Sequence, residues 1–213
     1  VRLGPTGVRS VCTGLERLAT FSDNDQNASL IRDHGVGVSA VLRTLGQAWQ
    51  LRSSEKLVLC GLMHDVGKLL LSQSGMIDYG NLPGALVDTA DSLHTVERER
   101  LGFDHAVIGG HILRTWGFPD PIPLVVAWHH QPTRAYRVGG EVGLMVALLR
   151  LANVLEYQLH SDRLVNPYFL EDLADTPCAR QTGFHAHDLE TLWPRLLADH
   201  DRMLGHLGAY ARG

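Results

Sequence analysis

Side chains able to do chemistry gather in one apolar stretch of this sequence, GLMHDVGKLLL, which runs from Gly61 to Leu71. His64 and Asp65 stand side by side in it, and Lys68 follows three residues after the aspartate. Titratable groups are rarely buried without a partner, because the loss of their water is costly. Either the histidine and the aspartate satisfy each other as a structural pair, or a bound species compensates for their burial.

Three further stretches place histidines in similar surroundings. They are LIRDHGVGVSAVL with His34, GFDHAVIGGHIL with His105, and VVAWHHQP with His129 and His130. Imidazole and carboxylate groups together suit first-row divalent metal ions, and one aspartate can bridge two such ions. If the stretches are helical, each helix points one or two ligands inward, which is how a helical bundle builds a metal site. We therefore predict that these histidines and Asp65 converge on one internal site.

Each of these histidines taken alone has an ordinary explanation. His34 suits a hydrogen-bonded core position, and His129 with His130 suits a helix end, where positive charge interacts favourably with the helix dipole. The prediction of a metal site therefore depends on the joint order His, His-Asp, His, His-His. His111 is expected to be a packing or surface residue. Six other histidines stand in polar or terminal settings and are expected to be solvated: His94, His160, His185, His187, His200 and His206.

Apolar residues recur at three- and four-residue steps along most of the chain, which is the period of helices that bury one face. No stretch combines two-residue alternation with hairpin turn signals. The predicted helices span Val8–Phe21, Ala28–Trp49, Glu55–Leu71, His105–Trp116, Pro121–His130, Val142–Leu159 and Asp188–Leu207. The sequence therefore predicts an all-α helical bundle, with residues 1–213 in a single domain.

Local signals refine this picture of the helices. Asp104 is a candidate N-cap for the helix that begins at His105. Trp116 and Trp128 lie beside apolar stripes, so both are expected to be largely buried. Residues 160–185 lack a helical pattern of this kind, and we predict an irregular surface excursion there.

The composition excludes several classes of protein. The 213 residues are 45% hydrophobic and 20% charged, and the formal net charge of −4 gives no basic surface typical of DNA-binding proteins. Cys12, Cys60 and Cys178 are far apart and form no CxxC pair, which favours a reducing compartment. No apolar run is long enough to span a membrane, and no signal-peptide pattern opens the chain. We therefore expect a cytoplasmic protein with no membrane partner.

The chain resembles the HDOD branch of the HD superfamily of metal-dependent phosphohydrolases, a branch found in bacterial signalling proteins. The resemblance lies in GLMHDVGKLLL, ERERLGFDHAVIGGHILRTWGFPDPIPLVVAWHHQP and LLRLANVLE, and with the approach through His34 it covers about Val1 to Gln158. The G-F-D-H opening, the W-G-F-P turn and the final H-H-x-P occur together in the expected order. Members of this branch usually carry an additional N-terminal helical lobe before the Leu3-Gly4 position, and we expect that lobe to be missing here.

The resemblance implies a set of metal ligands. The positions that match the superfamily are His34, His64, Asp65, His105, His129 and His130. A further aspartate ordinarily follows on the next long helix, where this sequence has Asn153. An amide oxygen can contact a metal ion but brings no charge, so a second divalent ion is expected to bind weakly. The candidate ions are manganese, iron, zinc, nickel and magnesium.

The resemblance also bears on catalysis. It implies Asp65 and Lys68 as the catalytic pair, since Lys68 lies one helical turn after Asp65 and could reach a substrate phosphate. The HD-GYP branch, whose members hydrolyse cyclic dinucleotides, follows its His-His pair with a Gly-Tyr-Pro loop. Here QPTRAYRVGG follows instead. The phosphodiesterase interpretation therefore lacks a loop signature as well as a metal carboxylate.

Three functions are compatible with these features. The first is a regulatory domain of bacterial signal transduction with a non-catalytic or weakly catalytic metal site, and with other signalling proteins or domains as partners. The second is a metal-dependent phosphohydrolase that acts on a nucleotide or a cyclic dinucleotide. The third is a sensor that binds a nucleotide without hydrolysing it. Asn153 and the missing loop favour the first, whereas the retained ligands keep the second open, so the sequence leaves enzymatic activity undecided.

Overall fold

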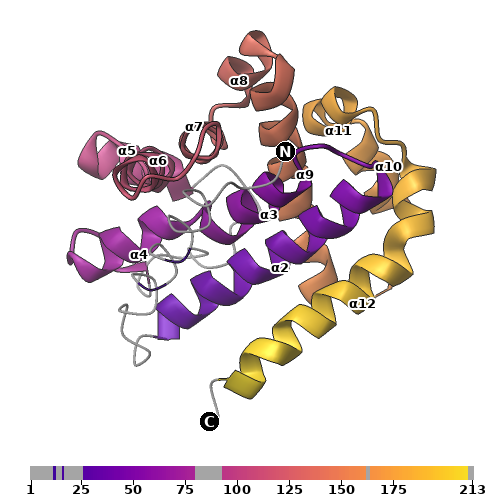
Figure 1. Cartoon of the computed structure of the whole chain (residues 1–213), viewed down its shortest axis with the longest axis horizontal. Helices are drawn as coiled ribbons and strands as arrows, with labels where there is room; N and C mark the ends of the chain where they lie inside the picture. Colours follow the sequence, from indigo (N-terminus) through magenta and orange to yellow (C-terminus); the bar gives the residue numbers. More distant parts are fainter. Residues whose placement is uncertain (1–11, 13–15, 17–25, 80–92, 162–163, 211–213) are drawn as a thin grey trace.

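The computed structural model describes residues 12, 16, 26–79, 93–161 and 164–210. These residues form helices and no strand, which confirms the all-α prediction for this part of the chain (Figure 1). The predicted helix Val8–Phe21 lies outside the described residues, apart from Cys12 and Glu16. The helices are α2 (Gln26–Ala48), α3 (Ser54–Met63), α4 (Val66–Gln73), α5 (Leu93–Leu101), α6 (His105–Thr115), α7 (Ile122–Trp128), α8 (Pro132–Val138), α9 (Gly140–Ser161), α10 (Pro167–Ala174), α11 (Pro177–Thr182) and α12 (Ala186–Tyr210).

Helix α9 runs through the hydrophobic core. It contacts α2, α3, α7, α8, α11 and α12, and apolar residues along its length from Met145 to Leu159 are buried. Long helix α2 packs along α3 on one side and against α12 on the other (Figure 1). By length and composition α9 could cross a membrane, which the sequence analysis had not expected, but 61% of its apolar window is buried inside the protein. Such burial is ordinary for the core helix of a helical bundle.

The predicted helix Glu55–Leu71 is divided into α3 and α4 by a turn at His64 and Asp65. A Cβ atom on Gly67, in the first turn of α4, would lie 2.0 Å from the carbonyl oxygen of His105 at the start of α6. The two helices can approach this closely only because residue 67 is a glycine. The approach places the turn beside α6. Apolar periodicity continues through the turn, so the sequence pattern could not reveal it.

Helix α6 begins where the sequence predicts. The Asp104 side chain accepts a hydrogen bond of 2.9 Å from the backbone N–H of Val107, which confirms the N-cap. The carboxylate also forms an ion pair of 2.5 Å with Arg98 of α5. Together these contacts fix the first residue of α6, His105, against its neighbours.

Residues 160–185 are more regular than predicted, because they contain α10 and α11. Asn166 caps α10 by accepting hydrogen bonds from the N–H groups of the second and third helical residues, and Thr176 caps α11 in a similar way. Each helix has proline at its first position, which suits a helix start. Buried Leu170 and Leu173 attach α10 to the core. These helices are short, so their apolar period is too brief to stand out in the sequence.

Trp116 and Trp128 are only partly buried, which corrects the expectation that both are largely buried. Both pack against the core with part of the indole ring. The guanidinium carbon of Arg134 lies 4.4 Å from the centre of the Trp128 ring, in a cation–π contact. Tryptophan is large, so one edge commonly stays at the surface even when the rest is packed.

Candidate metal centre

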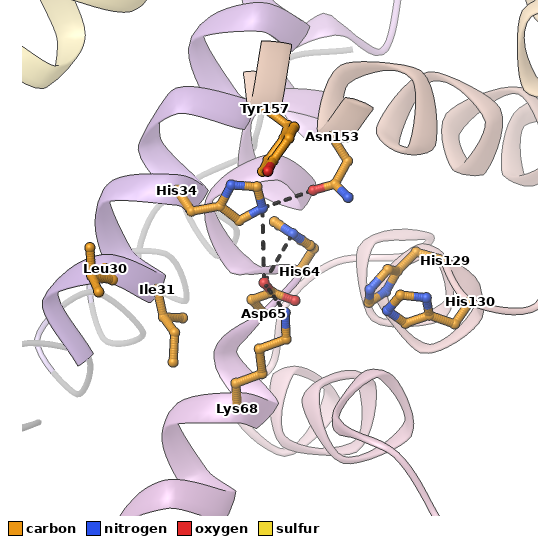
Figure 2. A pocket seen from close by; sticks show the side chains of 10 residues that line it. All are labelled: Leu30, Ile31, His34, His64, Asp65, Lys68, His129, His130, Asn153 and Tyr157. Atoms are coloured by element: carbon orange, nitrogen blue, oxygen red, sulfur yellow. Dashed lines mark hydrogen bonds and ion pairs between the residues drawn. The ribbon is translucent and has the colours of Figure 1, made fainter. Parts of the chain in front are cut away.

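The structure brings the predicted histidine and aspartate ligands together from several elements. They come from α2, the turn between α3 and α4, the start of α6 and the end of α7. Figure 2 shows the side chains from α2, the turn and the end of α7 around one pocket, with Asn153 of α9 at its edge. In two groups the candidate ligand atoms all lie within 4.8 Å of one another: His34, His64 and Asp65, and His105, His129 and His130.

Asp65 lies between the two groups. Its Oδ2 is 3.4 Å from Nε2 of His64, and its Oδ1 is 3.3 Å from Nε2 of His105. Nε2 of His105 is in turn 3.0 Å from Nε2 of His130. The two carboxylate oxygens therefore face different histidine groups, which is the arrangement that a carboxylate shared by two ions requires.

Two of the histidine rings are fixed by backbone carbonyl groups. Nδ1 of His64 donates to the Gly61 oxygen at 2.8 Å, and Nδ1 of His129 donates to the Val126 oxygen at 2.6 Å. With the proton on Nδ1, the lone pair of each ring is on Nε2. Metal-ligating histidines are usually oriented by a hydrogen bond of this kind.

Two further rings, those of His34 and His105, are fixed by buried carboxylates that the sequence analysis missed. Nδ1 of His34 lies 2.7 Å from Oε2 of Glu156, and Nδ1 of His105 lies 2.7 Å from Oε2 of Glu97. A Cβ atom on Gly37 would lie 2.6 Å from the Glu156 carboxylate, so the glycine leaves the space that this side chain occupies. Glu156 is the one carboxylate in the apolar stretch Val142–Leu159, and a carboxylate in apolar surroundings is the same sequence signal that marked Asp65.

The electrostatics of the pocket favour the neutral form of two rings, those of His64 and His129. Burial lowers the pKa of His64 to about 4, and burial together with the neighbouring His130 lowers the pKa of His129 well below its ordinary value. Nε2 of His129 is buried and has no hydrogen-bond partner among the described residues. A neutral imidazole with an unused, inward lone pair is the form that binds a metal ion. This donor set therefore fits a divalent cation.

Asp65 is held in its ionised form. Although burial opposes the charge, the neighbouring His64 and Lys68 hold the pKa of the Asp65 carboxyl well below its ordinary value. The ammonium of Lys68 donates to Oδ2 of Asp65 at 2.8 Å, and both side chains are buried. Lys68 lines the pocket (Figure 2), but its ammonium is engaged with the aspartate in this structure.

Asn153 lies on long helix α9 and lines the pocket beside His34. Its Oδ1 accepts a hydrogen bond of 2.8 Å from Nε2 of His34, and that nitrogen is 4.0 Å from Oδ2 of Asp65. Burial disfavours a charged His34 ring, but the hydrogen bond and charge of Glu156 outweigh it and raise the pKa of His34. Hydrogen bonds to Asp65 and Glu97 likewise outweigh burial and raise the pKa of His105, so the rings of His34 and His105 both hold a proton more firmly than an ordinary histidine does.

Two histidines expected to be solvated are buried. The ring of His94 stacks on that of His130, with centroids 4.4 Å apart, and Nε2 of His200 lies 3.3 Å from Oε1 of Glu156. Both sit in polar stretches of sequence, so only the tertiary contacts reveal their burial. His111, His160, His185 and His187 are exposed, as expected, and the side chain of His206 lies outside the described residues.

Comparison with known proteins places the fold. A protein from Shewanella amazonensis, proposed to be a phosphohydrolase, matches with a TM-score of 0.60 and 17% identity over 95% of this chain and 74% of its own. The MmoQ response regulator from Methylococcus capsulatus matches with a TM-score of 0.55 and 21% identity over 89% and 67%. An HDOD domain protein of unknown function from Geobacter sulfurreducens matches with a TM-score of 0.56 and 16% identity.

These likenesses extend over only part of some of the relatives. The match with the Geobacter protein covers 83% of this chain and 63% of that protein, which is less than two thirds of its length. No curated protein matches the chain. At such identities the solved structures support a common fold. The sequence profile of the HDOD domain matches residues 1–132, which is more than half of the chain. The chain therefore belongs to the HDOD domain family.

Proposed function

We propose that this chain is a regulatory domain of bacterial signal transduction that binds a divalent metal ion and has little or no hydrolytic activity. One observation carries the proposal: the ring nitrogens are preorganised around Asp65, while a neutral amide, Asn153, occupies the edge where a second carboxylate would complete the centre. The site thus has the ligands to hold an ion but lacks the charge to hold two ions firmly.

The balance of charge favours one tightly bound ion. His105, His129 and Asp65 would hold it together with His130, and His34 with His64 would provide a weaker second position. Two divalent ions would share one ligating carboxylate, and that carboxylate already neutralises Lys68. A bound ion would supply Lewis-acid polarisation of a phosphoryl or carbonyl oxygen.

The regulatory role is also supported by the family. The chain belongs to the HDOD domain family, and one protein of similar fold is a response regulator. We propose cytoplasmic signalling proteins or domains as partners. The alternative is a metal-dependent phosphohydrolase for a nucleotide or cyclic dinucleotide, and the observation that favours it is the buried cation of Lys68 in the wall of the metal pocket.

Metal analysis combined with a hydrolysis screen tests the proposal. Protein purified without chelators, stripped and then titrated with manganese should bind one ion tightly and a second at least tenfold more weakly. The screen should use bis(p-nitrophenyl) phosphate, nucleotides and cyclic dinucleotides in the presence of manganese. Turnover well above that of the Asp65→Ala variant would contradict the regulatory proposal and favour the phosphohydrolase. The absence of any metal binding would contradict both.

A further inference from the structure

A second cavity adjoins the metal centre. Its volume is about 270 Å³, compared with about 40 Å³ for the pocket at the centre itself. The two share four lining residues: His64, His129, His130 and Asn153. From these residues the larger cavity extends between α8, α9 and the α10–α11 segment. A molecule bound at the metal centre could therefore place the rest of its structure in this space.

Beyond the shared residues, the wall is largely apolar. Leu149 and Val154 of α9 face it, together with Leu173 of α10 and Cys178 of α11. Thr176 also lines the cavity, but its hydroxyl donates to the Leu173 carbonyl at 2.6 Å. Such a wall suits an apolar group better than a sugar or another body that needs many hydrogen bonds.

Tyr136 brings a polar group into this largely apolar wall. Its hydroxyl is buried and has no hydrogen-bond partner among the described residues. Ligand pockets commonly combine apolar walls with a small number of polar groups that set orientation. Tyr136 provides one such group.

The end of the cavity nearest the metal centre carries positive charge. Lys68 and Arg150 are the cations that line the two cavities, and Asp65 is the carboxylate that faces them. The Arg150 guanidinium is held there by a hydrogen bond of 2.8 Å to the His129 carbonyl. A divalent ion at the centre would add two further positive charges. This end of the cavity therefore favours an anionic group.

We propose that the cavity binds a small amphiphilic anion, with a phosphate or phosphonate head at the metal centre and a compact apolar body between α9 and the α10–α11 segment. The proposal rests on the proposed metal-binding function. It goes beyond that function by naming the class of ligand. The apolar part of the ligand is assigned to a defined wall of the cavity, and a nucleotide is expected to bind less well.

Matched phosphonates test both halves of the ligand. Manganese-loaded protein is titrated calorimetrically with methylphosphonate, phenylphosphonate and AMP, after manganese binding itself has been measured. The head groups of the two phosphonates are alike, so the difference between them reports the apolar body. Burial of a phenyl ring should make phenylphosphonate bind about tenfold or more tightly than methylphosphonate. It should also bind more tightly than AMP.

A cavity-filling variant assigns the preference to the wall. Val154 is 36% exposed, so Val154→Trp can be accommodated by the fold while the indole fills the cavity mouth. The variant should lose the preference for phenylphosphonate and keep its affinity for methylphosphonate. His160→Trp is the control. His160 is exposed, belongs to the same helix as Val154 and lines neither cavity. The control should behave as wild type.

Three results would overturn the proposal while leaving the metal-binding function intact. They are equal affinity for the two phosphonates in the wild type, tighter binding of AMP than of phenylphosphonate, and an unchanged preference in Val154→Trp. Failure of the first manganese titration would be a different outcome, because it would remove the proposed metal function and this inference together.

Discussion

The substitution Asn153→Asp tests why the centre should hold one ion more firmly than two. The amide oxygen of Asn153 lies 2.8 Å from Nε2 of His34, and that nitrogen lies 4.0 Å from Asp65. A carboxylate at position 153 would therefore place its charge within a few Å of an ion bound at His34 and His64. The variant introduces the aspartate that the resemblance to the HD superfamily implies for this position.

The magnitude follows from the charges. Two unit charges about 4 Å apart interact by about 4 kcal/mol at an effective dielectric constant of about 20, and a divalent ion doubles this value. Two effects offset the gain. The new carboxylate would repel Asp65, and in the metal-free protein it would pair with His34, whose pKa is already raised by Glu156. We expect a net gain of roughly 1.4 to 3 kcal/mol, or about 10- to 100-fold tighter binding of the second ion.

Calorimetric titration of stripped protein with manganese measures this change directly. Asn153→Leu is the matched control, because it removes the amide without adding charge and should not tighten the second site. A phosphodiesterase assay on the same samples shows whether occupancy of the second site brings turnover. Equal stoichiometry and equal affinities in wild type and Asn153→Asp would refute the electrostatic explanation. High turnover in the wild type would refute the regulatory role.

The remaining predictions concern the elements that hold the centre in place. Glu156→Gln should weaken binding of the second manganese ion by about 10- to 100-fold, because His34, a ligand of the second position, loses its charged partner. Calorimetric titration measures the loss, and an unchanged affinity would show that the ring is positioned without that charge. Gly67→Ala should lower the free energy of unfolding by about 3 kcal/mol, because the new Cβ atom would overlap the His105 carbonyl oxygen. Scanning calorimetry should show a Tm that is lower by roughly 6–12 °C, and a Tm equal to that of the wild type would contradict the close approach of the two helices. Asp104→Ala should cost about 1 to 2 kcal/mol through loss of the α6 N-cap, measured by urea unfolding, whereas Asp104→Asn should retain most of the stability.

The sequence by itself determined the helical class and predicted which histidines gather around Asp65. Helices α2, α6, α9 and α12 lie close to their predicted ranges, because apolar residues recur along each of them at three- and four-residue steps. The order of His34, the His64–Asp65 pair, His105 and the later His-His pair also sufficed to predict which side chains meet. Local patterns and residue types such as these are visible in the sequence without any knowledge of the fold.

Only the tertiary structure decided how those side chains are held. The contact between His34 and Glu156 joins residues 122 positions apart, and no local pattern specifies such a distance. The burial of His94 and His200 likewise comes from neighbours on other helices, although both lie in polar sequence. The turn at Asp65 leaves the apolar period intact. Its position depends on close packing of α4 against α6, which only the folded chain creates.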